Sequence, residues 1–281
     1  MQRERVTDDI YVFTSDLYAQ VTAGVIVTTE GAVVIDTLVY PEETRQMKRF
    51  ITERLGVDVK MVINTHFHAD HTTGTCFFDG AQVIAHRRCR ELLNLRGRES
   101  LERVRTTMPE MRDVTLVLPN VVFEDRLTLY LGNKTLSLWW TPGHSMDSIV
   151  CLVEEDQVLF AADTLMPLPY FVDGSYDAFL STLEKLRPNT FESVVQGHGE
   201  IILRGEVEEK IFSDLDYLSR LKRAVEKAFT HNALEDALNA IDIEDCGKSR
   251  ILLHGAVQQL HRQNVLSLAE QYRTQGTFAV S

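Results

Sequence analysis

The 281-residue sequence has few cysteines and fewer basic than acidic residues. Cys76, Cys89, Cys151 and Cys246 are scattered without CxxC spacing, which predicts reduced thiols and argues against disulfides or a zinc knuckle. Lys and Arg together number 29 against 41 Asp and Glu, giving a formal net charge of −12. This acidic balance argues against a general nucleic-acid-binding surface, which would need a clustered basic footprint, and against adsorption to an anionic membrane.

Long apolar runs are also missing. No stretch approaches the roughly 18 apolar residues of a membrane span, and residues 1–9 lack the apolar core of a secretion signal, so we expect a cytoplasmic protein that acts on a small molecule. No Gly/Ser-rich linker or internal repeat divides the chain. With 44% apolar residues it can bury a large core, and we predict a catalytic domain over residues 1–205 and a helical extension over 206–281.

Metal-competent side chains, in contrast, are concentrated in one short segment. Residues 66–71 read His-Phe-His-Ala-Asp-His and follow the apolar run 59–63. A strand ending there would place His66 and His68 on one side, and a turn after Ala69 would bring Asp70 and His71 to a neighbouring point. This layout favours two adjacent metal ions over one.

Three more candidate ligands follow strand-like runs elsewhere in the chain. His144 follows the run 135–140, Asp163 follows the run 158–160, and His198 lies between two glycines after Val194 and Val195. Glycines beside such positions permit sharp turns and close backbone approach. Because a buried cluster of ionisable groups is costly without a compensating cation, the seven side chains predict a buried binuclear site.

These motifs resemble the metallo-β-lactamase superfamily, in particular its branch with a full binuclear ligand set, as in glyoxalase II. The resemblance covers residues 8 to 200 and implies a four-layer αββα sandwich with an apolar hairpin formed by residues 23–28 and 31–37. It further implies one metal held by His66, His68 and His144, a second held by Asp70, His71 and His198, and a bridge formed by Asp163.

Imidazole and carboxylate ligands without thiolate suit two divalent ions, with zinc first and iron, manganese or cobalt as alternatives. Metal coordination lowers the pKa of water to roughly 7, so a bridging hydroxide could attack a carbonyl at neutral pH. We therefore expect a hydrolase of an ester, lactone or thioester. The alternatives are phosphodiester or sulfate-ester hydrolysis, an iron-dependent oxidoreductase resembling persulfide dioxygenases, and metal storage. A β-lactamase is less favoured, because those enzymes usually lack one residue of this ligand set.

Two residues are candidates for direct roles in catalysis. The outer oxygen of Asp70 could orient the hydroxide or accept its proton. Tyr170 lies in the segment 166–171, where two prolines would stiffen a loop leaving the metal site, and its ring could contact substrate. In the superfamily's lactonases a substrate-binding tyrosine follows the bridging aspartate by three residues, whereas that position here is Met166.

The segment 87–105 is locally basic, with seven arginines against three glutamates. One interpretation is an electropositive lid that recognises a carboxylate or phosphate. The other is a solvated helix whose pairs Arg87/Glu91 and Glu99/Arg103 have i,i+4 spacing.

Helical periodicity dominates the end of the chain. Apolar residues recur at three- and four-residue steps over 207–225 and again over 249–272, where His254 and His261 would share one face. These helices should pack on the core or form a homodimer. The basic glutathione-binding motif of glyoxalase II is not recognisable, although Lys248 and Arg250 are nearby candidates.

Overall fold

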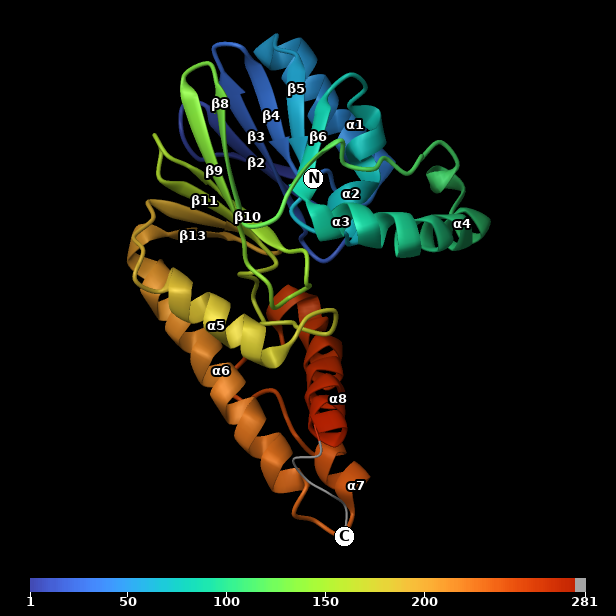
Figure 1. The fold of residues 1–281 in the computed structure, drawn as a ribbon, viewed down its shortest axis with the longest axis vertical. Helices are drawn as coiled ribbons and strands as arrows, with labels where there is room; N and C mark the ends of the chain where they lie inside the picture. The colour runs from blue at the N-terminus through green and yellow to red at the C-terminus, as the bar shows by residue number, and fades with distance from the viewer. Residues whose placement is uncertain (276–281) are drawn as a thin grey trace.

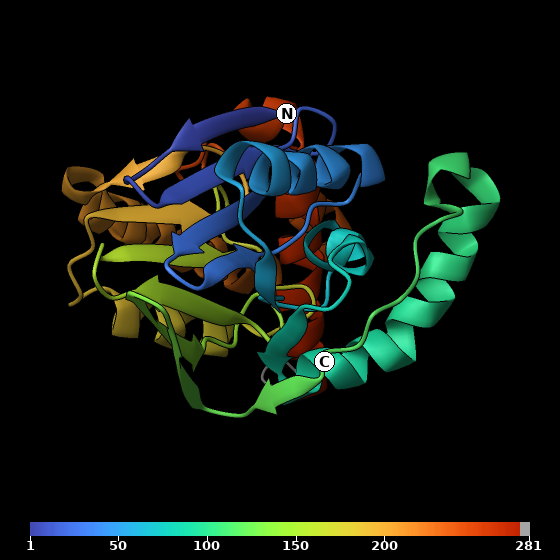
Figure 2. The ribbon, with the colours of Figure 1, turned by 90° about the horizontal axis from the view of Figure 1, so that it is seen from above.

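The computed structural model describes residues 1–275 and contains two sheets packed face to face between layers of helices (Figure 1, Figure 2). Helix α1 covers the outer face of the first sheet (Figure 2), α5 and α6 pack against the outer face of the second, and α8 packs against α6 below the two sheets (Figure 1). This arrangement confirms the predicted four-layer αββα sandwich. No helix within residues 1–275 is long and apolar enough to cross a membrane.

The first sheet has its strands in sequence order, and the predicted early hairpin is formed by β3 and β4. Its buried residues alternate between the two faces of the sheet, because side chains along a strand point to opposite sides. The strands are β1 Gln2–Arg5, β2 Ile10–Thr14, β3 Thr22–Thr28, β4 Gly31–Ile35, β5 Val59–Ile63, β6 Gln82–His86 and β7 Val121–Phe123.

The second sheet runs in the order β13-β12-β11-β10-β9-β8. It is antiparallel except where β11 pairs with β12. The strands are β8 Arg126–Leu131, β9 Lys134–Trp140, β10 Ile149–Val153, β11 Val158–Ala162, β12 Ser193–Gln196 and β13 Ile201–Leu203.

Helices connect and cover these strands. Ser175 caps α5 by accepting a hydrogen bond from the Ala178 amide, and Pro41 occupies the first turn of α1, where no amide donor is needed. The helices are α1 Pro41–Arg49, α2 Ala69–Thr72, α3 Arg87–Leu92, α4 Arg98–Thr107, α5 Tyr176–Leu186, α6 Val207–Ala228, α7 Leu234–Asn239 and α8 Val257–Gln275.

Apolar packing holds the layers together. Ile26 and Ile63 of the first sheet meet Leu138 and Phe160 of the second in the core between the sheets. Gly24 is required at this contact, since a Cβ there would lie 2.1 Å from the Phe160 ring. Each Å² of apolar surface removed from water stabilises the folded chain by about 25 cal/mol, so this interior makes the main contribution to the free energy of unfolding.

The C-terminal helices share one apolar cluster with the second sheet. Leu218 of α6 and Val265 of α8 are fully buried together with Leu159 and Val194. The predicted packing of these helices on the core is therefore observed, and the periodicity over 207–225 is confirmed as α6. The division at residue 205 stays a prediction, and residues 276–281 of the predicted extension lie outside the described residues.

The predicted helix over 249–272 is wrong at its start. Leu253 and His254 have positive φ angles of 47° and 54°, and α8 begins only at Val257. Left-handed backbone interrupts an α-helix. His254 therefore lies before α8, where its side chain is exposed. His261 alone lies on α8, where it contacts the Tyr217 hydroxyl at 2.9 Å and therefore has a packing role.

Candidate metal centre

Ligand candidates from distant parts of the sequence meet at one edge of the sandwich. His66 and His68 follow β5, His144 follows β9, Asp163 directly follows β11, and His198 follows β12. Because β11 and β12 are parallel, their carboxyl ends lie side by side, and the two sheets bring the end of β5 to the same place (Figure 1). The strand-end positions predicted from the sequence are thus confirmed.

Asp70 and His71 reach the site from the short helix α2. The predicted turn after Ala69 is a single helical turn over Ala69–Thr72, which His68 precedes in extended conformation. The Thr72 hydroxyl donates to the His68 carbonyl at 3.0 Å and closes this turn. The chain therefore presents His68 on one side of the turn and Asp70 and His71 on the other.

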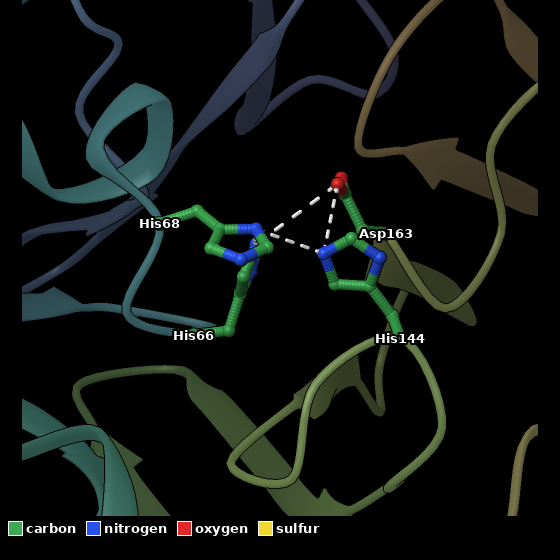
Figure 3. A group of neighbouring side chains, drawn as sticks. All are labelled: His66, His68, His144 and Asp163. Atoms are coloured by element: carbon green, nitrogen blue, oxygen red, sulfur yellow. Dashed lines mark hydrogen bonds and ion pairs between the residues drawn. The ribbon is translucent and has the colours of Figure 1, made fainter. Parts of the chain in front are cut away.

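Three imidazoles converge in the first group of side chains (Figure 3). The inner nitrogen Nδ1 of His68 lies 3.0 Å from Nε2 of His66 and 3.0 Å from Nε2 of His144. Asp163 completes the group, with Oδ2 3.3 Å from Nε2 of His144. The potential ligand atoms of these four residues all lie within 4.8 Å of one another.

The second group consists of Asp70, His71 and His198, whose potential ligand atoms also lie within 4.8 Å of one another. Oδ2 of Asp70 is 3.3 Å from Nε2 of His198. Asp163 lies between the two groups, since its Oδ1 is 3.3 Å from Nε2 of His71 while its Oδ2 faces His144. This is the place expected for a bridging carboxylate.

Outer hydrogen bonds fix which nitrogen of each ring faces inward. Nδ1 of His144 donates to the Tyr170 carbonyl at 2.8 Å, and Nδ1 of His198 donates to the Ala19 carbonyl at 2.9 Å. Nε2 of His68 contacts Oδ2 of Asp173 at 2.9 Å. Carbonyls and carboxylates only accept, so the outer nitrogens carry hydrogen and the inner nitrogens present lone pairs when the rings are neutral.

Asp36 orients histidines of both groups. Its Oδ2 accepts from Nδ1 of His71 at 2.8 Å and from the Thr65 hydroxyl at 2.7 Å, and its Oδ1 accepts from the Thr65 amide at 2.8 Å. Because the Thr65 hydroxyl donates to Asp36, it is an acceptor for Nδ1 of His66 at 3.1 Å. One buried carboxylate thus aims the inner nitrogens of His66 and His71.

Buried carboxylates govern the second group electrostatically. Burial alone would lower the pKa of His71, but Asp163 and Asp70 outweigh it and raise that pKa well above its usual value. The same two carboxylates, against the effect of burial, raise the pKa of His198 to about 10. The pKa of Asp163 is in turn lowered, because His198 and His71 overcome the effect of burial. The buried carboxylates of Asp70 and Asp163 therefore favour a positive charge between these side chains.

The first group provides lone pairs rather than charge. Burial lowers the pKa of His66 well below its usual value and that of His144 to about 4, so both rings are neutral at pH 7. Neutral inner nitrogens 3.0 Å apart repel one another unless a cation lies between them. Nε2 of His71 and Oδ1 of Asp163 are buried without a hydrogen-bond partner. The donor set therefore fits divalent metal ions.

The family follows from comparison with known sequences. The family model described as the metallo-β-lactamase superfamily matches residues 18–205. The chain belongs to this superfamily. The predicted placement within the glyoxalase II branch stays a prediction.

Relatives of this chain include proteins named as a thioesterase and as a metallo-beta-lactamase. Acyl-coenzyme A thioesterase MBLAC2 of Homo sapiens is 30% identical over 156 residues, which are 49% of this chain and 55% of the relative's length. Metallo-beta-lactamase type 2 of Bacteroides fragilis is 23% identical over 214 residues, covering 70% of this chain and 78% of that protein. A metallo-beta-lactamase family protein from Thermus thermophilus aligns with a TM-score of 0.71 at 19% identity over 97% of this chain and 95% of that one, a likeness of fold alone.

The candidate metal centre of this superfamily member opens into a pocket of about 910 Å³. His68, Asp70 and His198 reach its surface, whereas His66 and His71 are fully buried behind them. Pockets of roughly 300–1,000 Å³ are typical of small-molecule sites.

Tyr170, the predicted substrate contact, lines the pocket. Its ring lies 5.8 Å from that of His144, and its hydroxyl donates to Oε1 of Gln263 at 2.6 Å. Burial, with Asp173 and Asp163 nearby, raises the pKa of the phenol, so it is protonated at pH 7. Its catalytic role stays a prediction.

The arginine-rich segment lies along α3 and α4, and Arg96 is its one arginine that lines the pocket. Arg96 donates to Oδ1 of Asp173 at 2.8 Å, and the predicted pair Glu99/Arg103 is present at 2.9 Å. Arg87 instead contacts Glu124, so that predicted i,i+4 pair is wrong. Most of the segment is therefore an ordinary helix with a solvated face.

Lys248 and Arg250 are not part of the pocket lining. Lys248 is buried and donates to Oδ1 of Asp214 at 2.8 Å, and Arg250 contacts Glu244 at 2.8 Å. Both lysine and arginine therefore have structural partners.

Sequence reasoning missed Asp36 and Asp173. Asp36 directly follows β4 and so has the same strand-end position as the predicted ligands, a signal that was present in the sequence. Asp173 lies in an irregular loop ten residues after Asp163, and no local pattern marks it. Only the folded chain brings it to His68.

Proposed function

We propose that this protein is a metal-dependent hydrolase that cleaves an ester, lactone or thioester bond of a small molecule, with a thioester as the favoured substrate. The supporting observation is a set of inner ligand atoms, aimed by outer hydrogen bonds, that opens into a pocket of about 910 Å³. The thioesterase name of one relative favours the thioester, although this chain spans only 55% of that protein.

In the proposed site, the two ligand groups would hold two divalent ions, zinc first and iron or manganese as alternatives. The first group is His66, His68 and His144, the second is Asp70, His71 and His198, and Asp163 is shared. When bound, such ions supply Lewis acidity toward a carbonyl oxygen and lower the pKa of water.

The chain's own residues then have distinct roles. Asp70 lies at the pocket surface with its side chain 15% exposed, so its carboxylate can accept a proton from the attacking water. Water adds to the acyl carbon, the carbon–sulfur or carbon–oxygen bond breaks, and the leaving group takes the proton. Replacing Asp70 by Asn should cut turnover much more than substrate affinity.

Tyr170 is proposed to position the substrate. Its carbonyl holds His144 while its ring forms part of the pocket wall, so one residue links ligand orientation to the substrate surface. A small-molecule partner, a cytoplasmic location and a homodimer remain predictions from the sequence.

A panel of substrates tests the proposal. The metal-loaded protein is assayed with a lactone, a thioester, an aryl ester, a phosphodiester, a sulfate ester and a β-lactam, with Asp163→Ala as the control. We expect turnover of the thioester or another carboxylic ester that collapses in the variant. Turnover confined to the phosphodiester or sulfate ester would replace the proposed bond type, and activity that survives in Asp163→Ala would refute the site.

A further inference from the structure

Helix α4 is amphipathic, yet none of its residues is buried. Leu101 and Val104 lie on its apolar side and are half-buried, and Met108 follows directly at its end. All three line the pocket that contains the metal centre. The apolar side of this helix therefore faces the pocket instead of the protein core.

The opposite side of α4 is solvated. Arg103 contacts Glu99, and Glu102 and Thr106 are exposed. In Figure 2 the helix and the segment that returns from it extend away from the two sheets. The apolar side of an amphipathic helix normally packs against other apolar groups, and here the pocket lies against that side.

The segments flanking α4 extend the same apolar wall. Leu93 before it and Met111, Val114 and Leu116 after it also line the pocket. Gly97 allows close packing here, since a Cβ would lie 3.2 Å from Leu116. We call the wall formed by Leu93, Leu101, Val104, Met108, Met111, Val114 and Leu116 the α4 lobe.

The α4 lobe is continuous with the metal centre. His68, Asp70 and the lobe residues line one and the same pocket. The ion pair between Arg96 and Asp173 fastens the start of the helical segment to the carboxylate that holds His68. A substrate with its reacting carbonyl at the metal centre therefore has an apolar surface directly beside it.

We propose that the α4 lobe binds the hydrocarbon chain of an acyl group whose carbonyl is hydrolysed at the metal centre. This inference rests on the proposed function and names its substrate class, thioesters of acyl groups with a hydrocarbon chain. The chemistry of the wall favours this occupant, because its seven named side chains are apolar and Arg96, the one arginine in the pocket lining, is already paired with Asp173. A chain of methylenes needs no polar partner there.

The test compares acetyl, hexanoyl and decanoyl thioesters of N-acetylcysteamine with the metal-loaded enzyme. We expect kcat/KM to rise with chain length by up to about fourfold for each added methylene. Val104→Asp should lower kcat/KM for the decanoyl thioester more than about tenfold and leave the acetyl thioester within about twofold, because the carboxylate lies in the lobe and not at the metal centre. Thr106→Asp is the matched control on the solvated side of α4 and should change neither.

A binding measurement separates the lobe from the proposed reaction. Titration calorimetry with N-acetyl-N′-decanoylethylenediamine, in which an NH group replaces the thioester sulfur and no free thiol is present, should show binding that Val104→Asp weakens and Thr106→Asp does not. Binding with this pattern but no turnover of any thioester, ester or lactone would support the lobe and refute the proposed hydrolase. Turnover independent of chain length, or equal losses for all chain lengths in Val104→Asp, would overturn the lobe. So would a dimer in sedimentation analysis that Val104→Asp dissociates, because a second copy would then be the occupant.

Discussion

Replacing Asp36 by Asn should disable both metal-binding groups at once. Its two oxygens face N–H donors, Oδ1 the Thr65 amide and Oδ2 Nδ1 of His71, so the amide nitrogen of Asn would face a donor in either orientation. One charge-assisted hydrogen bond in a buried place is lost, which costs about 2 kcal/mol of the free energy of unfolding. Loss of such an outer ligand partner typically weakens metal binding by about 10–100-fold.

Asp173→Asn is the matched control, because it makes the same chemical change beside another ligand. The Asn oxygen can still accept from His68 while its amide nitrogen turns toward Arg96, so only an ion pair with a half-exposed arginine is lost. That loss should cost less than about 1 kcal/mol. Zinc affinity is measured by chelator competition, and stability by urea unfolding of the metal-free protein. Wild-type zinc affinity in Asp36→Asn, or equal weakening in both variants, would refute this account of ligand orientation.

Three further changes probe the site and its support. Gly197→Ala should reduce the rate of hydrolysis at least about a hundredfold, since the added Cβ would lie 1.9 Å from Oδ1 of Asp163. The control Gly205→Ala meets no atom within 4 Å and should leave the rate unchanged. An active Gly197→Ala enzyme would contradict the placement of the Asp163 carboxylate. Tyr170→Phe should lower kcat about tenfold in steady-state assays if the hydroxyl contacts substrate, and an unchanged kcat would limit that hydroxyl to its bond with Gln263. Asp214→Ala removes the carboxylate that pairs with buried Lys248 and partly buried Lys210 and should cost about 3–5 kcal/mol in urea unfolding, while a loss below about 1 kcal/mol would contradict that pairing.

The ligand candidates were predictable because their chemistry is local. His66, His68, Asp70 and His71 fall within six residues, and each remaining candidate follows a run that the structure forms as a strand. Strand ends gather at one edge of a sheet, so a short pattern in the sequence becomes a cluster in space. The four-layer fold followed from the resemblance that these motifs carry.

Features that depend on long-range contacts were not predictable. Asp173 reaches His68 only through the path of an irregular loop, and the apolar side of α4 looks in the sequence like an ordinary packed helix face. The late start of α8 has another cause, because left-handed backbone at Leu253 and His254 overrides an apolar spacing that continues through the turn. Neither residue is a glycine, and the one local signal for the break is Gly255, which directly follows them with a φ of 92°.

The central claim is that hydrolysis depends on the metal centre assembled from both ligand groups. The most direct test strips the protein of metal with a chelator, removes the chelator, and follows thioester hydrolysis as zinc is added back. We expect no turnover in the stripped protein and activity that rises to a plateau at about two zinc ions per chain. Undiminished hydrolysis by the stripped protein would contradict it.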